Sequence, residues 1–210
     1  IRRTRRATLN RTVAIGAKIL GEGERSFIVA EAGLNHNGDL DLAKKLVDAA
    51  VLVGCDAIKF QTFKKDGRIS SKVKSVKYAE TVIGLEETLH EMFSRLAMSF
   101  DDQEDLFSYA REKAIEVFST PFDLESVEFL ESIDNQLYKI ASVDLVNLPL
   151  IRRVAQTGKP MFLSTGMSTM GQVEEAVEEV CNEGNENLVL LHCNSSYPAT
   201  LFEMNLGVIN

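Results

Sequence analysis

The chain has 210 residues, of which 45% are hydrophobic and 26% are charged, a composition that fits one large globular domain and excludes a disordered chain. Its net charge of −8 comes from dispersed acidic residues and excludes a broad nucleic-acid-binding surface, although a local cluster of lysines can still bind a small anion. The apolar runs are shorter than the roughly 18 to 20 residues of a membrane span, and the three widely spaced cysteines are typical of reduced thiols in a cytoplasmic protein.

The first 24 residues are predicted to precede the main domain. Residues 1–6 are basic and contain no apolar stretch of the kind found in a secretory signal, so we expect a solvated tail. Two short alternating runs, followed by a turn-like Gly-Glu-Gly, predict a β-hairpin over residues 12–21. The main domain is then expected over residues 25–210.

The rest of the chain alternates between predicted strands and predicted helices. The apolar runs that predict strands lie at residues 27–30, 57–60, 115–118, 137–140, 161–163 and 188–191. Apolar spacings of three and four, together with capping residues, predict helices that begin at Asp39 and that cover residues 99–113, 123–133, 150–157 and 168–181. This alternation indicates a parallel sheet, either open and doubly wound or closed as a (β/α)8 barrel.

Polar residues lie at or just after the carboxyl end of every predicted strand, which favours the barrel. They are Glu31, Lys59, Gln61, Thr120, Lys139, Ser142, Ser164 and Ser195. TIM-barrel sites are assembled at that face from several strands, whereas a doubly wound sheet concentrates its site at one switch point. We therefore expect an α/β TIM (β/α)8 barrel that this chain covers through its sixth strand. The long segment from Thr62 to Leu85 has no core pattern and is typical of a lid or substrate loop.

Two lysines inside apolar strands, Lys59 and Lys139, are the candidate cations. A buried lysine is costly unless it is paired or binds an anion, so the pair points to an anionic substrate, although each can also be a snorkelling or ion-paired residue. Glu31 ends the first strand, where a carboxylate can transfer a proton. A salt bridge from Glu31 to Lys59 is the structural alternative, and both roles are compatible.

Six motifs carry a resemblance to a known family. They are Ile-Val-Ala-Glu-Ala-Gly-Leu-Asn-His-Asn-Gly at 28–38, Lys-Phe-Gln-Thr at 59–62, Ser-Thr-Pro-Phe-Asp at 119–123, Tyr-Lys-Ile-Ala-Ser at 138–142, Leu-Ser-Thr-Gly-Met at 163–167 and Leu-His-Cys-Asn-Ser-Ser-Tyr-Pro at 191–198. In this order and spacing the sequence resembles the sialic acid synthase family, which includes the synthases of sialic, legionaminic and pseudaminic acids. Two of the stretches look closer to the legionaminate type than to animal sialic acid synthases.

The resemblance implies a reaction and a set of site residues. Phosphoenolpyruvate C3 attacks the aldehyde of an N-acylated, mannosamine-type sugar, water adds at C2, and phosphate leaves. The catalytic residues implied are Glu31, Lys59 and Lys139, and the substrate-binding residues implied are Gln61, Thr120, Ser142, Asp144, Ser164, Ser195 and Tyr197. Asp144 and Val143 differ from the residues common in sialic acid synthases, Glu and Gly, which leaves the identity of the sugar open.

The resemblance also implies a divalent metal, manganese or magnesium, and a homodimer. The two histidines that bind the metal in the family follow the sixth strand, so we expect the protein ligands beyond residue 210, together with the last two strands and an antifreeze-like domain. We interpret His36 and His192 as hydrogen-bonded structural residues.

Two other functions remain open from the sequence. A Schiff-base aldolase could use Lys139 as its nucleophile, because a desolvated lysine at a strand end is suited to that chemistry. A noncatalytic barrel remnant could bind an anion or a sibling chain. We favour a fragment of a longer synthase.

Overall fold

The computed structural model describes residues 9–64, 88–196 and 198–209, and these residues form two compact units. One runs from Phe27 to Asn135 and is called here the 27–135 unit. The other, the terminal unit, combines residues 1–26 with residues 136–210. Most of the predicted loop from Thr62 to Leu85, and the candidate residue Tyr197, lie outside the described residues.

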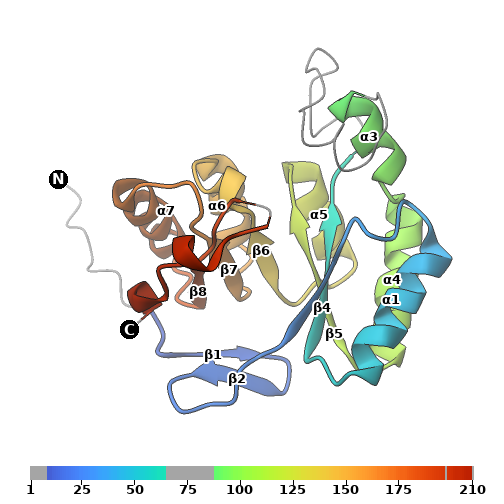
Figure 1. Cartoon of the computed structure of the whole chain (residues 1–210), viewed down its shortest axis with the longest axis horizontal. Helices are drawn as coiled ribbons and strands as arrows, with labels where there is room; N and C mark the ends of the chain where they lie inside the picture. Colours follow the sequence, from blue (N-terminus) through green and yellow to red (C-terminus); the bar gives the residue numbers. More distant parts are fainter. Residues whose placement is uncertain (1–8, 65–87, 197, 210) are drawn as a thin grey trace. The chain divides into compact units, whose positions relative to one another are not determined.

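The 27–135 unit contains three parallel strands, with β4 in the middle (Figure 1). They are β3 (Val29–Gly33), β4 (Ala57–Thr62) and β5 (Glu116–Pro121). Glu31 on β3 lies opposite Lys59 on β4, and Gln61 lies opposite Thr120 on β5. The register therefore aligns four of the candidate residues across neighbouring strands.

The helices of this unit begin at capping residues. They are α1 (Leu40–Leu52), α3 (Leu89–Leu96), α4 (Phe100–Glu112) and α5 (Leu124–Ser132), and their caps are Asp39, Thr88, Ser99 and Asp123. Each cap side chain accepts a backbone N–H of the first turn, which confirms the predicted starts at Asp39, Ser99 and Asp123. Helices α1 and α4 lie side by side, joined by a hydrogen bond from Tyr109 to Asp48 (Figure 1).

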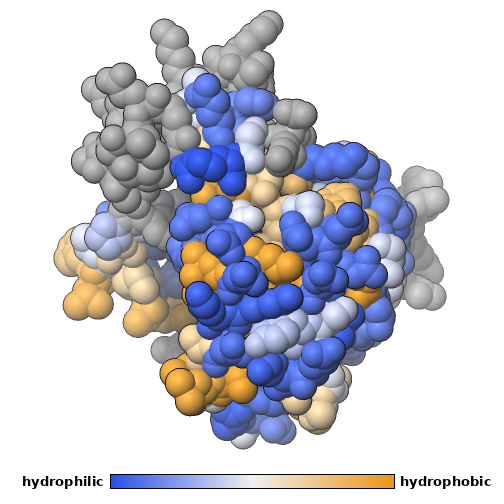
Figure 2. All heavy atoms as spheres, turned by 90° about the vertical axis from the view of Figure 1, so that its right-hand side faces the viewer, coloured by the Kyte–Doolittle hydropathy of each residue, from blue (hydrophilic) through white to orange (hydrophobic). Residues whose placement is uncertain are grey.

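The outer face of α1 and α4 is mainly hydrophilic, with small hydrophobic areas between the polar residues (Figure 2). The inner face buries Ala43 and Val47 of α1 and Leu106 and Phe107 of α4. This division is the expected consequence of apolar residues at spacings of three and four. Within the residues that the structure describes, no helix is both long and apolar enough to span a membrane.

The strands are shifted relative to the prediction. Strand β3 begins at Val29, because the N–H of Ile28 donates to the Asp56 carboxylate at 2.7 Å and the Ile28 carbonyl accepts from Asp56 and Ala57. Strands β4 and β5 continue to Thr62 and Pro121, beyond the predicted ends at residues 60 and 118. Residues 61, 62, 119 and 120 are polar and therefore break the apolar pattern, although they still pair in the sheet.

The terminal unit contains the predicted hairpin and three further parallel strands. Strands β1 (Thr12–Ile15) and β2 (Lys18–Gly21) pair antiparallel, which confirms the hairpin. Strands β6 (Tyr138–Ile140), β7 (Met161–Ser164) and β8 (Leu188–Leu191) are parallel, with β7 in the middle. The alternation predicted from periodicity is therefore confirmed in both units.

Helices α6 (Leu148–Ala155) and α7 (Met170–Asn182) of the terminal unit lie side by side, and Arg152 pairs with Glu179 between them (Figure 1). Helix α6 begins before the predicted residue 150, because Asn147 caps it and proline is tolerated in a first turn. Short 3-10 helices follow β6 and β8: η1 (Ser142–Asp144), η2 (Leu201–Glu203) and η3 (Leu206–Ile209).

Candidate active site

Four candidate residues come together in the 27–135 unit around a buried ammonium group. The Lys59 Nζ atom lies 2.9 Å from Glu31 Oε2 and 3.3 Å from Thr120 Oγ1. A Cβ atom added to Gly33 would lie 3.0 Å from Glu31 Oε1 and 3.4 Å from Gln61 Nε2, which places Gln61 beside the same carboxylate. The ion pair between Glu31 and Lys59, one of the two roles considered from the sequence, is confirmed.

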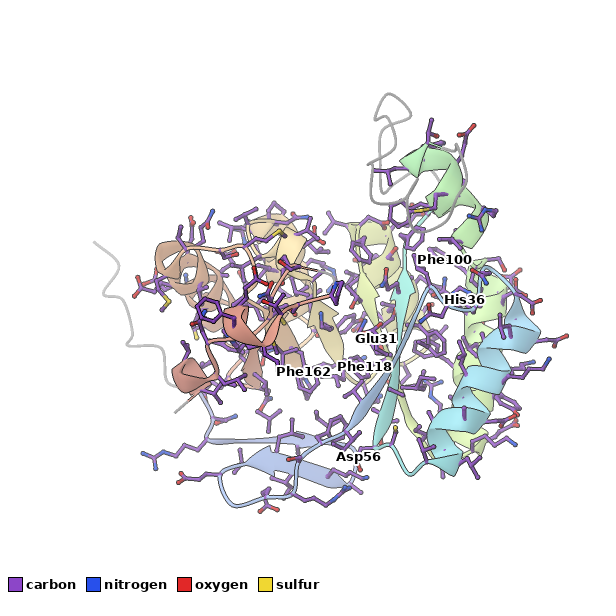
Figure 3. All side chains as sticks on the ribbon, in the orientation of Figure 1. Glu31, His36, Asp56, Phe100, Phe118 and Phe162 are labelled. Atoms are coloured by element: carbon purple, nitrogen blue, oxygen red, sulfur yellow. The ribbon has the colours of Figure 1, made fainter. Side chains whose placement is uncertain are left out.

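This cluster lies toward the carboxyl ends of its strands. Figure 3 shows Glu31 on β3 and His36 in the loop that follows it, with Asp56 at the opposite end of the strands. Lys59 is buried, whereas Glu31 is largely exposed. Lys59 on β4 lies between a carboxylate on β3 and a hydroxyl on β5, and a cation held in this way is suited to binding an anion. The exposed carboxylate can exchange a proton with a substrate.

A buried hydrogen-bond chain supports the other face of β4 and β5. The Thr62 hydroxyl donates to Gln103 Oε1 at 2.7 Å, and the Gln103 amide donates to the Met98 carbonyl at 3.1 Å. Thr62 has only one proton, so the 2.7 Å contact between Thr62 and Ser119 has Ser119 as its donor. These hydrogen bonds fix the ends of the strands that carry Gln61 and Thr120.

The terminal unit holds the serine hydroxyls. Ser142, which directly follows β6 and Ala141, accepts a hydrogen bond from the Gly166 N–H at 3.1 Å. A Cβ atom added to Gly166 would lie 2.9 Å from both Ser142 Oγ and Ser195 Oγ, so these two hydroxyls converge on one glycine. Ser164, the last residue of β7, is buried, and its hydroxyl has no hydrogen-bond partner among the described residues. Buried hydroxyls are nearly always paired, and an acceptor atom of a ligand could pair with this one.

The two remaining candidates of this unit lie on either side of Ser142. Lys139 is half-buried in β6, opposite Phe162 of β7. Asp144 ends η1, and its Oδ1 accepts from the Asn147 amide at 3.3 Å. The structure thus brings together Glu31, Lys59, Gln61 and Thr120 in the 27–135 unit, and the hydroxyls of Ser142 and Ser195 in the terminal unit. The terminal unit also carries Lys139, Asp144 and Ser164.

The histidines make the expected structural hydrogen bonds. His36 is buried, its Nδ1 accepts from the Gly38 N–H at 3.0 Å, and burial lowers its pKa despite a hydrogen bond to Gly33 and the nearby charge of Asp39. The Nε2 atom of His192 lies 2.7 Å from the Met204 carbonyl oxygen. Among the described residues, no three His, Cys, Asp or Glu side chains are grouped so that they could hold a metal ion.

The sequence predicts no functional role for Gly166 or Gln103, two residues near the site. Gly166 lies within the motif Leu-Ser-Thr-Gly-Met, but its contacts with two serines depend on how three segments approach each other. Gln103 is one of several polar residues in α4, and its burial depends on the packing of that helix against β4 and β5.

Comparison with known proteins shows that the chain is similar to synthases of amino-sugar acids. The model of the NeuB family matches residues 46–210. The N,N'-diacetyllegionaminic acid synthase of Campylobacter jejuni is 40% identical over 185 residues, which are 87% of this chain and 55% of that protein. The pseudaminic acid synthase of Helicobacter pylori is 34% identical over 179 residues, 85% of this chain and 53% of that protein.

The solved structures agree with this result. The crystal structure of the N-acetylneuraminic acid synthetase from Leptospira borgpetersenii in complex with citrate is 31% identical and has a TM-score of 0.84, covering 96% of this chain and 66% of that one. The chain spans about half the length of the curated relatives that it matches. The family match extends over most of the chain, and the relatives are similar over nearly all of it. The chain belongs to the NeuB family.

Proposed function

We propose that the complete gene product condenses phosphoenolpyruvate with an N-acylated, mannosamine-type amino sugar to give a nonulosonic acid and phosphate. The observation that carries the proposal is the buried ammonium of Lys59, which lies between Glu31 and Thr120 at the carboxyl ends of parallel strands. The names of the relatives, synthases of legionaminic and pseudaminic acids, support the class of product.

Phosphoenolpyruvate carries a phosphate and a carboxylate, and its pocket needs fixed cations and hydrogen-bond donors. In this proposal Lys59 and Thr120 bind it from the 27–135 unit. The family resemblance also implies Lys139, Ser142, Ser164 and Ser195 as phosphoenolpyruvate-binding residues, and the buried Ser164 hydroxyl has no hydrogen-bond partner among the described residues. The amino sugar is held by Gln61, Asp144 and Tyr197.

The proposed reaction forms one carbon–carbon bond. The electron pair of the phosphoenolpyruvate double bond attacks the aldehyde carbon through C3, and the aldehyde oxygen takes up a proton to become a hydroxyl. Water adds at C2 and loses a proton, which leaves a hydroxyl on C2. The bond between C2 and the phosphate oxygen then breaks, and the hydroxyl proton leaves with the phosphate to give the keto acid. Glu31 is the proposed proton-transfer group, because its carboxylate is the exposed member of the cluster.

The family resemblance implies a divalent metal, manganese or magnesium, that would polarise the aldehyde. The described residues do not fit such an ion, because they contain no group of three metal-binding side chains. We place its protein ligands outside this chain and assign no step here to it. The proposal also includes closure of the strands into a (β/α)8 barrel, a homodimer and a cytoplasmic location.

The test is phosphate release by the complete gene product, supplied with phosphoenolpyruvate, manganese and a panel of N-acylated mannosamine-type sugars. We expect release that requires both the sugar and the metal and that falls at least about a hundredfold in Lys59→Met, because that variant loses a buried cation that pairs with the substrate. Mass spectrometry of the product identifies the sugar.

Two results would contradict the proposal. Absence of release with every sugar, from a folded protein that binds phosphoenolpyruvate, would favour the noncatalytic anion-binding remnant. Covalent trapping of pyruvate on Lys139 by borohydride would favour the Schiff-base aldolase, because a synthase of this kind forms no imine.

A further inference from the structure

We infer that Gly166 is a positioning residue of the phosphoenolpyruvate site, because the space left by its missing side chain sets where the hydroxyls of Ser142 and Ser195 lie. The inference rests on the proposed function. It adds a residue that binds no substrate atom through a side chain and that acts through two serines.

Gly166 is constrained by the atoms around it and not by its backbone conformation. The φ angle of Gly166 lies outside the left-handed region, so its backbone conformation is open to alanine. An added Cβ would nevertheless lie 2.9 Å from Ser142 Oγ, 2.9 Å from Ser195 Oγ and 3.1 Å from the Cys193 carbonyl oxygen. Contacts of this length with carbon are repulsive. Gly166 is therefore required for space alone.

The backbone of Gly166 also orients one of the hydroxyls. Its N–H donates to Ser142 Oγ at 3.1 Å, so that oxygen acts as an acceptor toward the protein. A serine hydroxyl has one proton and two lone pairs, and the proton of Ser142 can then be donated to a ligand. An anion with several oxygens is a suitable ligand for a donor held in this way.

The expected effect of an alanine follows from which atoms can move. Ser142 and Ser195 meet the added methyl group through the ends of their side chains, which can rotate to other staggered positions. The Cys193 carbonyl needs to shift by only a few tenths of an ångström. The fold should therefore survive, while both hydroxyls leave the positions from which they donate.

Gly171 supplies a matched control in the same unit. It also lacks a positive φ angle, it lies in helix α7, and a Cβ added there meets nothing within 4 Å. Gly171→Ala therefore makes the same chemical change without displacing any neighbour.

The experiment measures phosphoenolpyruvate binding to the complete gene product by isothermal titration calorimetry. We expect Gly166→Ala to weaken binding by about 10- to 100-fold, the loss expected when one or two hydrogen bonds to a charged group are removed. Its thermal unfolding midpoint should stay close to the wild-type value. Gly171→Ala should bind phosphoenolpyruvate as the wild type does.

A double-mutant cycle tests whether Gly166 acts through the serines. In a Ser142→Ala, Ser195→Ala background the two hydroxyls are gone, so adding Gly166→Ala should weaken binding little further. A purely structural role would give the same loss in both backgrounds and would overturn the inference, as would unchanged binding by Gly166→Ala. If the wild-type protein itself bound no phosphoenolpyruvate, the proposed function would fail first, and the inference with it.

Discussion

The ammonium of Lys59 lies 2.9 Å from the carboxylate of Glu31 on the neighbouring strand, and the two ends of this ion pair differ sharply in exposure. The lysine side chain is 5% exposed and the glutamate side chain 56% exposed. Burial makes Lys59 depend on a negative partner, whereas Glu31 remains hydrated and accessible. One pair thus combines a buried cation with an accessible carboxylate.

The ion pair of Glu31 and its proposed catalytic role can be tested separately with Glu31→Gln. The variant leaves Lys59 buried without its carboxylate. We therefore expect the free energy of unfolding, measured in urea, to fall by about 1 to 3 kcal/mol. This loss is smaller than for a fully buried pair because Glu31 is exposed. Glu125→Gln is the matched control. Glu125 pairs with Lys64 at the surface, where the expected loss is at most about 0.5 kcal/mol.

The same variant makes a catalytic prediction for the complete gene product. Glu31→Gln should retain phosphoenolpyruvate binding, because the competing carboxylate is removed from Lys59, while kcat falls by about 10² to 10⁴, the usual contribution of a proton-transfer group. Calorimetry and steady-state phosphate release measure the two quantities. An unchanged kcat would leave Glu31 as an ion-pair partner only.

The Thr62 hydrogen-bond chain predicts a stability effect. Thr62→Val keeps the shape of the side chain but leaves Gln103 Oε1 and the Ser119 hydroxyl buried without their partner. We expect a loss of about 1 to 3 kcal/mol in the free energy of unfolding, measured by urea denaturation. Thr62→Ser preserves the hydroxyl and loses one buried methyl group, so it should cost about 1 kcal/mol. Equal losses in the two variants would show that packing, and not hydrogen bonding, is decisive.

The burial of His36 predicts that the stability of the protein depends on pH. Burial lowers its pKa in the folded protein from the ordinary value of 6.5, so below about pH 6.5 the unfolded chain takes up a proton that the folded protein resists. The free energy of unfolding should therefore fall as the pH decreases from 6.5 toward the lowered pKa. In His36→Gln, which cannot be protonated, this contribution to the slope should disappear. Urea denaturation at several pH values tests it, and identical slopes would contradict the prediction.

The ends of two helices provide a matched pair of backbone predictions. Ala114 follows α4 with a φ angle of 56°, and Gly184 follows α7 with a φ angle of 80°. This left-handed position suits glycine, so Ala114→Gly should stabilise the protein by about 0.5 to 1 kcal/mol. A Cβ on Gly184 meets nothing within 4 Å, so Gly184→Ala should destabilise it by a similar amount through backbone strain alone. Thermal unfolding compares the two, and shifts of the same sign would contradict the argument.

Local chemistry in the sequence determined the elements and much of the candidate site. Apolar periodicity predicts the alternation of strands and helices, and Asp39, Ser99 and Asp123 mark helix starts because a side-chain oxygen can satisfy the free N–H groups of a first turn. The ion pair of Lys59 with Glu31 could be proposed from the sequence, since a lysine within an apolar strand needs a negative partner.

Other features depend on contacts between segments that are far apart in the chain, and only the tertiary structure decided them. Strand β3 begins at Val29 because Asp56, 28 residues after Ile28, binds that backbone. The burial of Gln103 follows from the packing of α4 behind β4 and β5. The crowding of Ser142 and Ser195 around Gly166 follows from the approach of three separate segments of the chain. Periodicity and capping act within a few residues, whereas distances between side chains on different strands are fixed only when the strands pair and the core packs.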